Sequence, residues 1–596
     1  MPATRPLSSA LDESQPGETH VVCKGAAVPL PKKNKGAELK AWQRAVNANP
    51  SMKALDASLA EAVSDGYVLR PSEPRVRLTQ EEAAQLRDLN TRLLAQCRYN
   101  EIQPAVMAAG NNDRVVVMPG VYDEPTSRSA PTNDPSCEGL KEENDKGQTG
   151  ALSYRYQATC PNDQNLIAII GRQPGAEPPP QPPLWDRHGI PDNGPCIRCN
   201  LQLEGSGPGP DDVVVDAGRV ASGNGAPPDP VKDIVIRAER ADGIVIRNLT
   251  ARHAAEHGIY VVETDGQKLE RFKAFYNEEY GVLTFNADHA LMQDCEAVGA
   301  GDAALYPGSS ADVGEETIEA TPRLGNEIRE CDMHHNVLGY SGTNGNAVWI
   351  HHNDFYDNAL GLVTDVITAP GHPGYPQDSD LIENNEFYSN NFNPYVEQPA
   401  DTEVVPTIPI PVGTAMWILG GNNNEFRNNY VWDNWRRGVM LASVPDALVC
   451  GDNPIAGGNQ QKGCNPNAPP EQISTSYRNR FHDNVLGRSP DGVVAPNGDG
   501  NVLQGRTDFW WDQYVGSNTN CWYENVGKDG TAASLTTTPA APLLPGSCDP
   551  LLSTGTGGAL QSEEMYACLA PYGIDRENPP EGVPCDWFTT PERPTP

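Results

Sequence analysis

Basic side chains and long apolar runs are scarce in this chain of 596 residues. Lysine and arginine together number 44 against 79 aspartate and glutamate residues, which gives a formal net charge of −35. This excess argues against nucleic acid and anionic membranes as partners, because both are themselves negative. No stretch approaches the roughly 20 consecutive apolar residues that cross a bilayer, so we expect no membrane insertion. The segment 1–34 also lacks the apolar core of a signal peptide.

Cysteine, by contrast, is plentiful, with 14 residues. Several lie in loops rich in proline and glycine, where disulfides would compensate for a missing core. Such usage is typical of an oxidising compartment and predicts a secreted or cell-surface protein. Because a sequence does not fix connectivity, the pairs suggested by position are hypotheses. They join Cys137 with Cys160, Cys450 with Cys464, Cys521 with Cys548, Cys568 with Cys585 and Cys23 with Cys97.

The remaining four cysteines carry weaker signals. Cys196 and Cys199 form a single CxxC motif, and without a second pair or nearby histidines they do not predict a zinc site. Cys295 and Cys331 occupy equivalent positions in adjacent repeats, which favours a buried stack over catalytic thiols.

Eight segments between residues 245 and 492 repeat one pattern with a period that falls to the low twenties. Each has an apolar residue, two polar residues and then asparagine or a small or apolar residue, with a second asparagine or equivalent five positions later. A fixed period of this length indicates one structural unit stacked on its neighbours. The two recurring positions are occupied by Asn248, Phe272, Cys295, Cys331, Asn353, Asn385, Asn429 and Asn479, and by His253, Asn277, Ala300, Asn336, Asn358, Asn390, Asn434 and Asn484.

These residue types favour a solenoid of parallel strands. Equivalent residues then lie above one another at roughly 4.8 Å, so apolar positions form continuous interior columns. Asparagine at a bend tolerates a left-handed conformation, and its amide can bond to the backbone of the next coil. Helical repeats are disfavoured, because asparagine, glycine, valine and the aromatic residues of the pattern are poor helix formers. We therefore expect an all-β protein, a parallel β-helix.

Three regions are expected along the chain. Residues 1–98 form an N-terminal arm with helices over 36–65 and 79–97, the second with a capping start at Thr79. Residues 99–505 form the β-helix with long insertions, and residues 506–596 form a loop-rich capping region that contains cysteines.

The candidate site follows from where the insertions fall. The insertions 307–325, 366–380 and 394–414 all come after the strand that begins at the repeat's glycine, so their loops gather on one side of the solenoid and predict a cleft there. Paired carboxylates on that face could serve acid–base chemistry on a sugar, while the bland alternative is a solvated surface. The catalytic candidates are Asp302, Tyr306, His335, Asp365 and His372, and the substrate-binding candidates are Tyr260, Ser341, Tyr375, Trp435, Arg436 and Arg437.

Histidines cluster in two pairs, His334–His335 and His351–His352, which copper or zinc could use. Yet His334 matches Tyr356 of the next repeat, so the pairs also fit ordinary repeat positions. We therefore assign no metal ligands from the sequence.

The repeats, the asparagine columns and the segment Tyr99–Tyr122 together resemble the pectin-lyase-like right-handed parallel β-helix superfamily, over about residues 99–505. The resemblance implies a right-handed coil with a helix plugging its N-terminal end. That superfamily includes pectate lyases, polygalacturonases, alginate lyases and epimerases, and non-enzymatic surface proteins. None of their narrower motifs is complete: Val348–His352 resembles Val-Trp-Ile-Asp-His but has His351 in place of the aspartate, and Gly371-His372-Pro373 only partly matches Gly-His-Gly.

The fold hosts many functions, so three hypotheses remain. The first is a secreted, monomeric protein acting on an extracellular polysaccharide as a lyase or glycoside hydrolase. A lyase this acidic would need Ca²⁺ to bridge it to a polyuronate, although no calcium-loop motif is present. The second is a non-catalytic carbohydrate-binding or structural surface protein, and the weakest is a metal-handling β-helix protein.

Overall fold

The computed structural model describes residues 17–32, 35–124, 165–172, 196–218, 232–309, 324–343, 345–365, 377–399, 404–442, 476–498, 508–512, 519–532, 535–538 and 585–594, together with a few shorter pieces. Within these ranges the chain is mostly β-strand. The helices are α1 (Gly36–Ala48), α2 (Pro50–Ser64), α3 (Gln80–Gln96) and α4 (Ile102–Ala108), with short 3-10 turns at Pro210–Asp212 and Asp586–Phe588.

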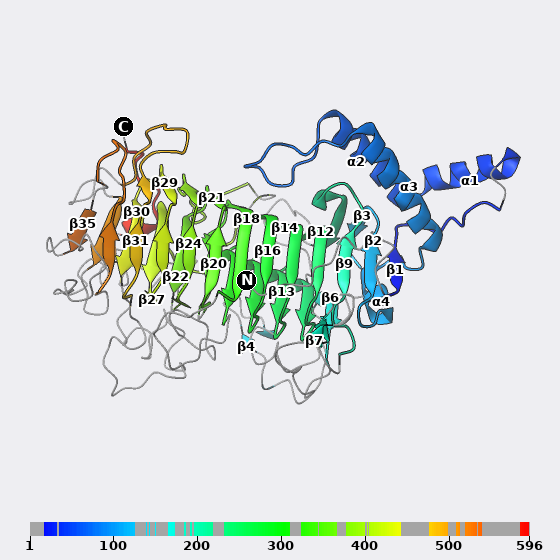
Figure 1. The fold of residues 1–596 in the computed structure, drawn as a ribbon, viewed down its shortest axis with the longest axis horizontal. Coiled ribbons are helices and arrows are strands. Elements are labelled where there is room, and N and C mark those ends of the chain that lie inside the picture. The colour runs from blue at the N-terminus through cyan, green and yellow to red at the C-terminus, as the bar shows by residue number, and fades with distance from the viewer. Residues whose placement is uncertain are drawn as a thin grey trace.

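Two long parallel sheets wind around one axis, which lies horizontally in Figure 1. We call the 18-stranded sheet "sheet 1" and the 11-stranded sheet "sheet 2". Sheet 1 contains β1 (Thr19–Val22), β2 (Arg114–Val117), β3 (Gly120–Tyr122), β9 (Gln202–Gly205), β10 (Val213–Asp216), β12 (Val245–Arg252), β14 (Lys268–Phe275), β16 (Leu291–Val298), β18 (Asn326–His334), β20 (Val348–His351), β21 (Asp354–Tyr356), β24 (Leu381–Glu383), β25 (Glu386–Tyr388), β28 (Glu425–Arg427), β29 (Tyr430–Trp432), β31 (Arg480–His482), β32 (Val485–Leu486) and β34 (Cys521–Tyr523).

Sheet 2 contains β6 (Asn165–Ile170), β11 (Ile234–Glu239), β13 (His257–Val262), β15 (Tyr280–Phe285), β17 (Ala303–Gly308), β19 (Leu338–Tyr340), β22 (Leu360–Asp365), β26 (Thr414–Leu419), β30 (Arg437–Ala442), β33 (Phe509–Asp512) and β35 (Leu535–Thr538). The sheets face each other across one continuous apolar core. The expected right-handed parallel β-helix is therefore confirmed.

Each coil turns at left-handed residues. In the coil that begins with β12, Asn248 (φ 55°) bends the strand in its middle, and His253 (φ 64°) turns the chain towards sheet 2. The residue after each bend points inwards, as Leu249 does, because the left-handed conformation interrupts the ordinary alternation of a strand. Side chains at equivalent positions of successive coils then stack. The ring centroids of Phe355 and Phe387, for example, lie 4.5 Å apart with nearly parallel planes.

Asparagine side chains form ladders inside the later coils. The backbone N–H and side-chain amide of Asn353 both donate to Oδ1 of Asn385, at 3.0 Å each, and Asn385 repeats this with Asn429. Each amide therefore satisfies the backbone of its own coil and of the coil before it. One ladder continues through Asn484 to Asn525, and the second comprises Asn336, Asn358, Asn390, Asn434 and Asn497.

The structure corrects the predicted register at both ends of the repeat. Asn248 and His253 are the left-handed corner residues, and Leu249 is the residue that pairs with Phe272. At the other end Asn484, not Asn479, joins the ladder of Asn429. Asparagine suits both the corner and the interior position, and a third ladder lies five residues upstream of the first, so shifts of one or five residues keep the same pattern.

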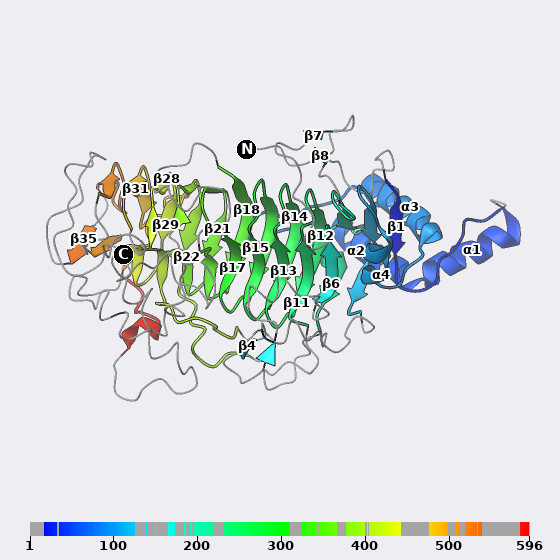
Figure 2. The same cartoon turned by 90° about the horizontal axis from the view of Figure 1, so that it is seen from below.

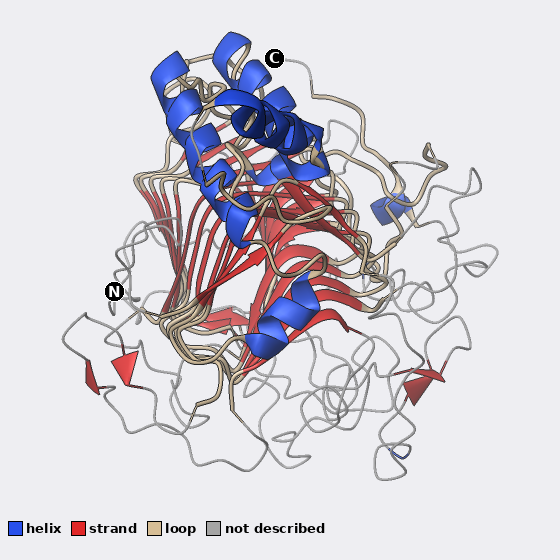
Figure 3. Ribbon diagram, turned by 90° about the vertical axis from the view of Figure 1, so that its right-hand side faces the viewer, coloured by secondary structure: helices blue, strands red, loops and turns tan. Residues whose placement is uncertain are grey.

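The N-terminal region closes one end of the solenoid, as Figure 3 shows along the axis. α4 packs against β1, β2 and β6, and Glu124 accepts hydrogen bonds from the first N–H groups of this helix. The predicted capping box at Thr79 is present at the start of α3. The single helix expected over 36–65 is two helices, because Asn49 caps the second one and Pro50 cannot donate to the first.

Disulfides link these parts. The predicted Cys23–Cys97 bond ties β1 to the end of α3. Cys196 and Cys199 are bonded to each other. Cys295 and Cys331 form a disulfide between adjacent coils, rather than an unbonded stack.

The remaining cysteine hypotheses reach beyond the described residues. Cys521 and Cys585 are both disulfide-bonded. Their predicted partners, Cys548 and Cys568, lie outside the described residues, as do the other two predicted pairs. Among the described helices none has the length and apolar composition needed to span a bilayer.

The ladders predict a strong dependence of stability on one amide. Asn385→Ala removes the acceptor for Asn353 and the donor to Ile350 and Asn429, which leaves several buried groups unsatisfied. We expect the free energy of unfolding in urea to fall by about 3 kcal/mol or more. Asn384→Gly, at the exposed left-handed neighbour, should change it by less than about 1 kcal/mol; equal effects would contradict the ladder's role.

The third ladder comprises Asp380, Asn424, Asn479 and Asn520, and so contains one carboxylate. Asp380 is fully buried between Val348 and Asn424, and burial raises its pKa well above its usual range. A raised pKa in the folded state means that the carboxyl stabilises the fold at low pH and loses this contribution as the pH rises. Asp380→Asn should therefore raise stability by about 1–3 kcal/mol at pH 8 and by less at pH 5, as measured by denaturation at both values. A larger gain at pH 5 would contradict it.

Candidate functional site

The structure gathers several predicted site residues on the outer face of sheet 2. Tyr260 and Tyr306 lie on β13 and β17 in one column, Asp302 precedes β17, and Ser341 follows β19. Asp365 ends β22, but its side chain lies outside the described residues, as do His372 and Tyr375. Tyr260 and Tyr306 therefore lie in one column of sheet 2, whereas His335 lies on sheet 1.

This face is buried, which corrects the expectation of an open cleft. Tyr260 and Ser341 are 1% exposed and Tyr306 is 6% exposed. The outward side chains of sheet 2 form a second apolar core, in which Val404 and Val412 of an insertion cover the sheet. Figure 2 shows the 404–413 segment (yellow-green) and the C-terminal 3-10 helix (red) on the same side of the solenoid. The described part of the 394–414 insertion carries its own apolar residues and so covers the face instead of framing a cleft.

The predicted tyrosine and arginine contacts are structural in this arrangement. The hydroxyl of Tyr306 bonds with Thr343 at 2.8 Å. Arg436 donates to the carbonyl oxygens of Val412, Asp586 and Thr589, and its guanidinium lies 5.0 Å from the ring centroid of Trp587. These bonds hold the C-terminal segment against the solenoid.

The neighbouring candidates are placed differently. Arg437 is 1% exposed and donates to the carbonyl of Arg436. Trp435 is half-buried and donates to Asp433. Arg437 is therefore not accessible to a substrate, whereas part of the Trp435 side chain is.

His335 alone of the described catalytic candidates is exposed, at a left-handed corner of sheet 1. Burial and the nearby His334 lower its pKa, against the opposing effect of Asp357. It adjoins a set of carboxylates that the sequence reasoning missed. Register pairs Glu296 of β16 with Asp332 of β18, then Asp354 of β21, then Glu386 of β25. We call these four residues the acidic row.

The acidic row was within reach of the sequence. Each member follows an inward residue of the repeat, such as Cys331 or Asn353, and strand alternation therefore turns it outwards. Most of the candidates predicted from the sequence instead follow the glycine strand of sheet 2, because the insertions come after that strand.

Beside the acidic row runs a stack of aromatic rings, formed by His334, Tyr356, Tyr388 and Trp432. Successive ring centroids lie 4.7, 5.0 and 4.6 Å apart with nearly parallel planes. Both faces of the Tyr356 and Tyr388 rings are therefore occupied, so these two residues present edges and hydroxyl groups rather than open stacking surfaces. Burial, followed by neighbouring carboxylates, raises the pKa of both tyrosines, which therefore remain protonated.

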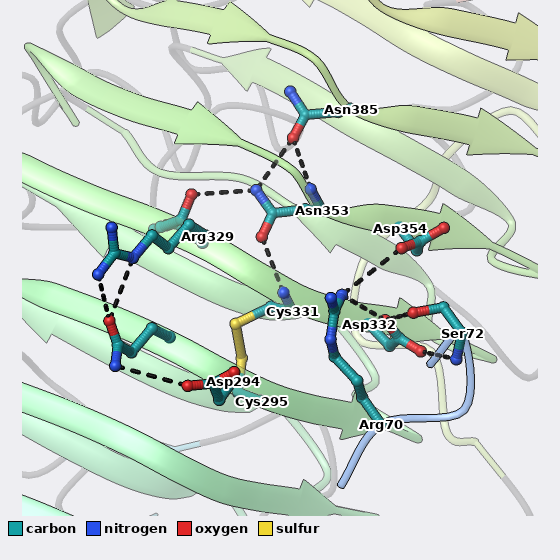
Figure 4. Close-up of a disulfide and its surroundings, with 12 residues drawn as sticks. Arg70, Ser72, Asp294, Cys295, Arg329, Cys331, Asp332, Asn353, Asp354 and Asn385 are labelled. Carbon is teal, nitrogen blue, oxygen red and sulfur yellow. Dashed lines mark hydrogen bonds and ion pairs between the residues drawn. A yellow bond between two sulfur atoms is a disulfide. The ribbon is translucent and has the colours of Figure 1, made fainter. Parts of the chain in front are cut away.

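A loop of the N-terminal region reaches over the acidic row. Tyr67 and Val76 pair across the base of this loop. One Nη of Arg70 lies 3.4 Å from Asp332 and 3.7 Å from Asp354, and the N–H and hydroxyl of Ser72 donate to Asp332 at 2.6 and 2.7 Å (Figure 4). Asp332 is thereby fully buried, whereas Asp354 and Glu386 remain partly exposed.

The members of the row differ in their protonation. Burial, assisted by the charges of Asp332 and Glu386, raises the pKa of Asp354 to about 7. Burial also raises the pKa of Glu386. At Glu296 burial acts in the same direction, but hydrogen bonds and charge from His334 and Lys273 outweigh it and lower the pKa. The pKa of Glu296 is thus lowered and that of Asp354 raised, so carboxyl groups of different acidity lie in one row.

The coils and their two sheets define the molecule as a right-handed parallel β-helix protein. No known family model and no curated protein matches the sequence. Among solved structures, it is similar to the A-module of mannuronan C-5 epimerase AlgE4 from Azotobacter vinelandii, with 11% identity, a TM-score of 0.36, and coverage of 75% of this chain and 94% of that chain. The surface adhesin PfbA of Streptococcus pneumoniae is 8% identical, with a TM-score of 0.35 and coverage of 70% and 79% respectively.

Pectate lyase Pel9A is also similar, with 11% identity and a TM-score of 0.29. The alginate lyase from Paenibacillus sp. is 11% identical, with a TM-score of 0.28. The pectate lyase match covers 74% of this chain and 72% of that chain. At these identities the likeness concerns the fold.

The burial of sheet 2 gives a direct test. Tyr260→Ala should leave a cavity in the second apolar core and lower the free energy of unfolding by about 3–5 kcal/mol, while Tyr260→Phe should lower it far less. Urea denaturation of both variants measures this. A Tyr260→Ala variant as stable as the unaltered protein would restore the exposed, substrate-facing role.

Proposed function

We propose that the protein is a secreted enzyme that hydrolyses an extracellular polysaccharide at the acidic row. The observation that carries the proposal is the pair formed by Asp354 and Glu386, which are in register on adjacent coils and partly exposed. Asp354, with a pKa of about 7, is protonated in about half of the molecules at neutral pH and can act as an acid there.

The two carboxyl groups take complementary roles. Asp354 donates its proton to the oxygen of the glycosidic bond as that bond breaks, and Glu386 acts from the other side of the sugar ring. Adjacent coils of a parallel sheet lie roughly 4.8 Å apart, close to the ~5 Å between the carboxyl groups of retaining glycosidases. This spacing favours attack of the Glu386 carboxylate on the anomeric carbon to form a covalent glycosyl intermediate. Water, deprotonated by Asp354, then displaces Glu386 and releases the sugar with retention of anomeric configuration.

Charge favours a neutral polysaccharide over a polyuronate. The cations at the row are already paired: Arg70 with Asp332, and Lys273 with Glu296 and Asp211. An anionic chain would therefore meet unneutralised carboxylates, which Ca²⁺ would have to bridge. Cleavage of a uronate polymer that requires Ca²⁺ would therefore indicate the lyase alternative.

Disulfides support the proposed location. The Cys23–Cys97 and Cys295–Cys331 bonds join segments far apart in the chain, as is usual in proteins that fold in oxidising compartments. A secreted or surface-exposed protein would meet its polysaccharide partner there.

The proposal predicts both a variant effect and a pH profile. Asp354→Asn should lower the release of reducing ends from a responsive neutral polysaccharide by about 10²–10⁴-fold, and the rate of the unaltered protein should fall as the pH rises through about 7, because Asp354 then loses its proton. Asp483→Asn, at an exposed carboxylate remote from the row, is the matched control.

The assay separates the alternatives. Neutral and anionic polysaccharides are compared, with Ca²⁺ or with chelator, and ultraviolet absorbance detects unsaturated uronates. Absorbance on a uronate polymer would indicate a lyase instead. If no polymer in a broad panel is cleaved, hydrolysis is excluded in favour of a binding or structural role.

A further inference from the structure

Two histidine pairs at the corners of sheet 1 share one geometry. Nδ1 of His334 lies 2.9 Å from Nδ1 of His335, and Nδ1 of His351 lies 2.8 Å from Nδ1 of His352. The paired rings are nearly perpendicular in both cases, at 80° and 83°. The pairs occupy different bends in adjacent coils, so the same arrangement arises twice on different backbone corners.

The backbone corner explains how consecutive side chains meet. His334 and His351 end outward-facing strand segments, and His335 and His352 follow with φ values of 53° and 55°. In an extended strand the next side chain would point to the opposite face, but the left-handed residue keeps it on the same side.

Each pair is also oriented by a carboxylate. Nε2 of His334 lies 3.2 Å from Glu296, and Nε2 of His351 lies 3.0 Å from Glu327. Metal-binding histidines commonly use their second nitrogen in this way, which fixes the ring and leaves the other nitrogen for the metal. The same corner at His482 pairs with Asp483 instead, so the doubled histidine is a choice of residue and not a requirement of the turn.

We infer that each histidine pair binds one Cu²⁺-like divalent transition metal ion through its two Nδ1 atoms. Two nitrogens at about 2.0–2.1 Å from one ion are about 2.9 Å apart at a right angle, and about 3.4 Å apart at a tetrahedral angle. The observed distances match the right angle of the square-planar sites that Cu²⁺ and Ni²⁺ prefer, and Cu²⁺ has the higher affinity for nitrogen ligands. His335 and His352 are exposed, so an ion can reach both pairs and keep its other positions for water.

Metal binding by the histidine pairs is independent of the proposed function. It requires neither catalysis at the acidic row nor a bound polysaccharide. Asp357 occupies the next position of the corner column, and its backbone carbonyl accepts a hydrogen bond from the N–H of His335. Glu296, a member of the acidic row, contacts His334 through Oε1, while its Oε2 lies 2.9 Å from Lys273.

Titration with copper tests the inference. The untagged full chain, freed of metal, is titrated with Cu²⁺ in a non-coordinating buffer and followed by calorimetry and electron paramagnetic resonance. We expect two ions per chain with nitrogen hyperfine coupling. His335→Asn and His352→Asn should each remove one ion, and the double variant should remove both, since asparagine is tolerated at left-handed corners.

Two further variants sharpen the result. His289→Asn alters a left-handed histidine that faces Asp288 and not a second histidine, and it should retain both ions. Glu296→Gln should weaken binding at the first pair by 10–100-fold. Cu²⁺ should also raise the melting temperature of the unaltered protein and not that of the double variant. Unchanged stoichiometry in the double variant, or no copper binding by the unaltered chain, would overturn the inference and leave the pairs as hydrogen bonds between imidazoles.

Discussion

The left-handed corner followed by an inward side chain is the constraint on which the rest of this structure depends. It bends sheet 1 in the middle of each coil, turns the chain towards sheet 2, and places two consecutive side chains on one face of the surface. Where the inward residue is asparagine, as at Asn353, Asn385 and Asn429, its amide also satisfies the backbone of the neighbouring coil. Backbone conformation, interior hydrogen bonding and surface chemistry are thus set by the same few residues.

The fold could be predicted from the sequence because these corner residues recur with the chain's own period. The register was harder to predict, because asparagine serves equally well as a corner residue, at Asn248, and as an interior residue, at Asn484. Alternation identifies which side chains point out of the coil, but not what lies over them. Tyr260 does point outwards, yet Val404 and Val412, distant in sequence, cover the sheet on which it lies.

The acidic row shows the opposite case. Its alternation was readable, but its character depends on Arg70 and Ser72, more than two hundred and fifty residues away in the chain. The raised pKa of Asp354 arises from burial and from carboxylates on neighbouring coils, neither of which is local in sequence. The histidine pairs could be recognised in the sequence. That their nitrogens face each other depends on φ values, which only the three-dimensional structure supplies.

The two outer faces of the solenoid therefore have different tasks. Sheet 2 is covered by the insertion that contains Val404 and Val412 and by the C-terminal segment, which Arg436 holds in place. Sheet 1 keeps an outer surface of ordered charges: Arg247 bonds Glu270 at 2.6 Å, and Arg427 bonds Glu383 at 2.7 Å, each across a coil boundary. Such pairs align along the axis because the repeat places equivalent residues one coil apart.

The disulfide between Cys295 and Cys331 stands where the interior column changes from Leu249 and Phe272 on one side to Asn353 and Asn385 on the other. A solenoid contacts only its neighbours, so it can lose coils one at a time from either end. A disulfide between two adjacent coils opposes such fraying, because neither coil can unfold without the other. The disulfide lies at the N-terminal end of the acidic row, so loss of coils that begins at the N-terminal end is halted before it reaches Asp354 and Glu386.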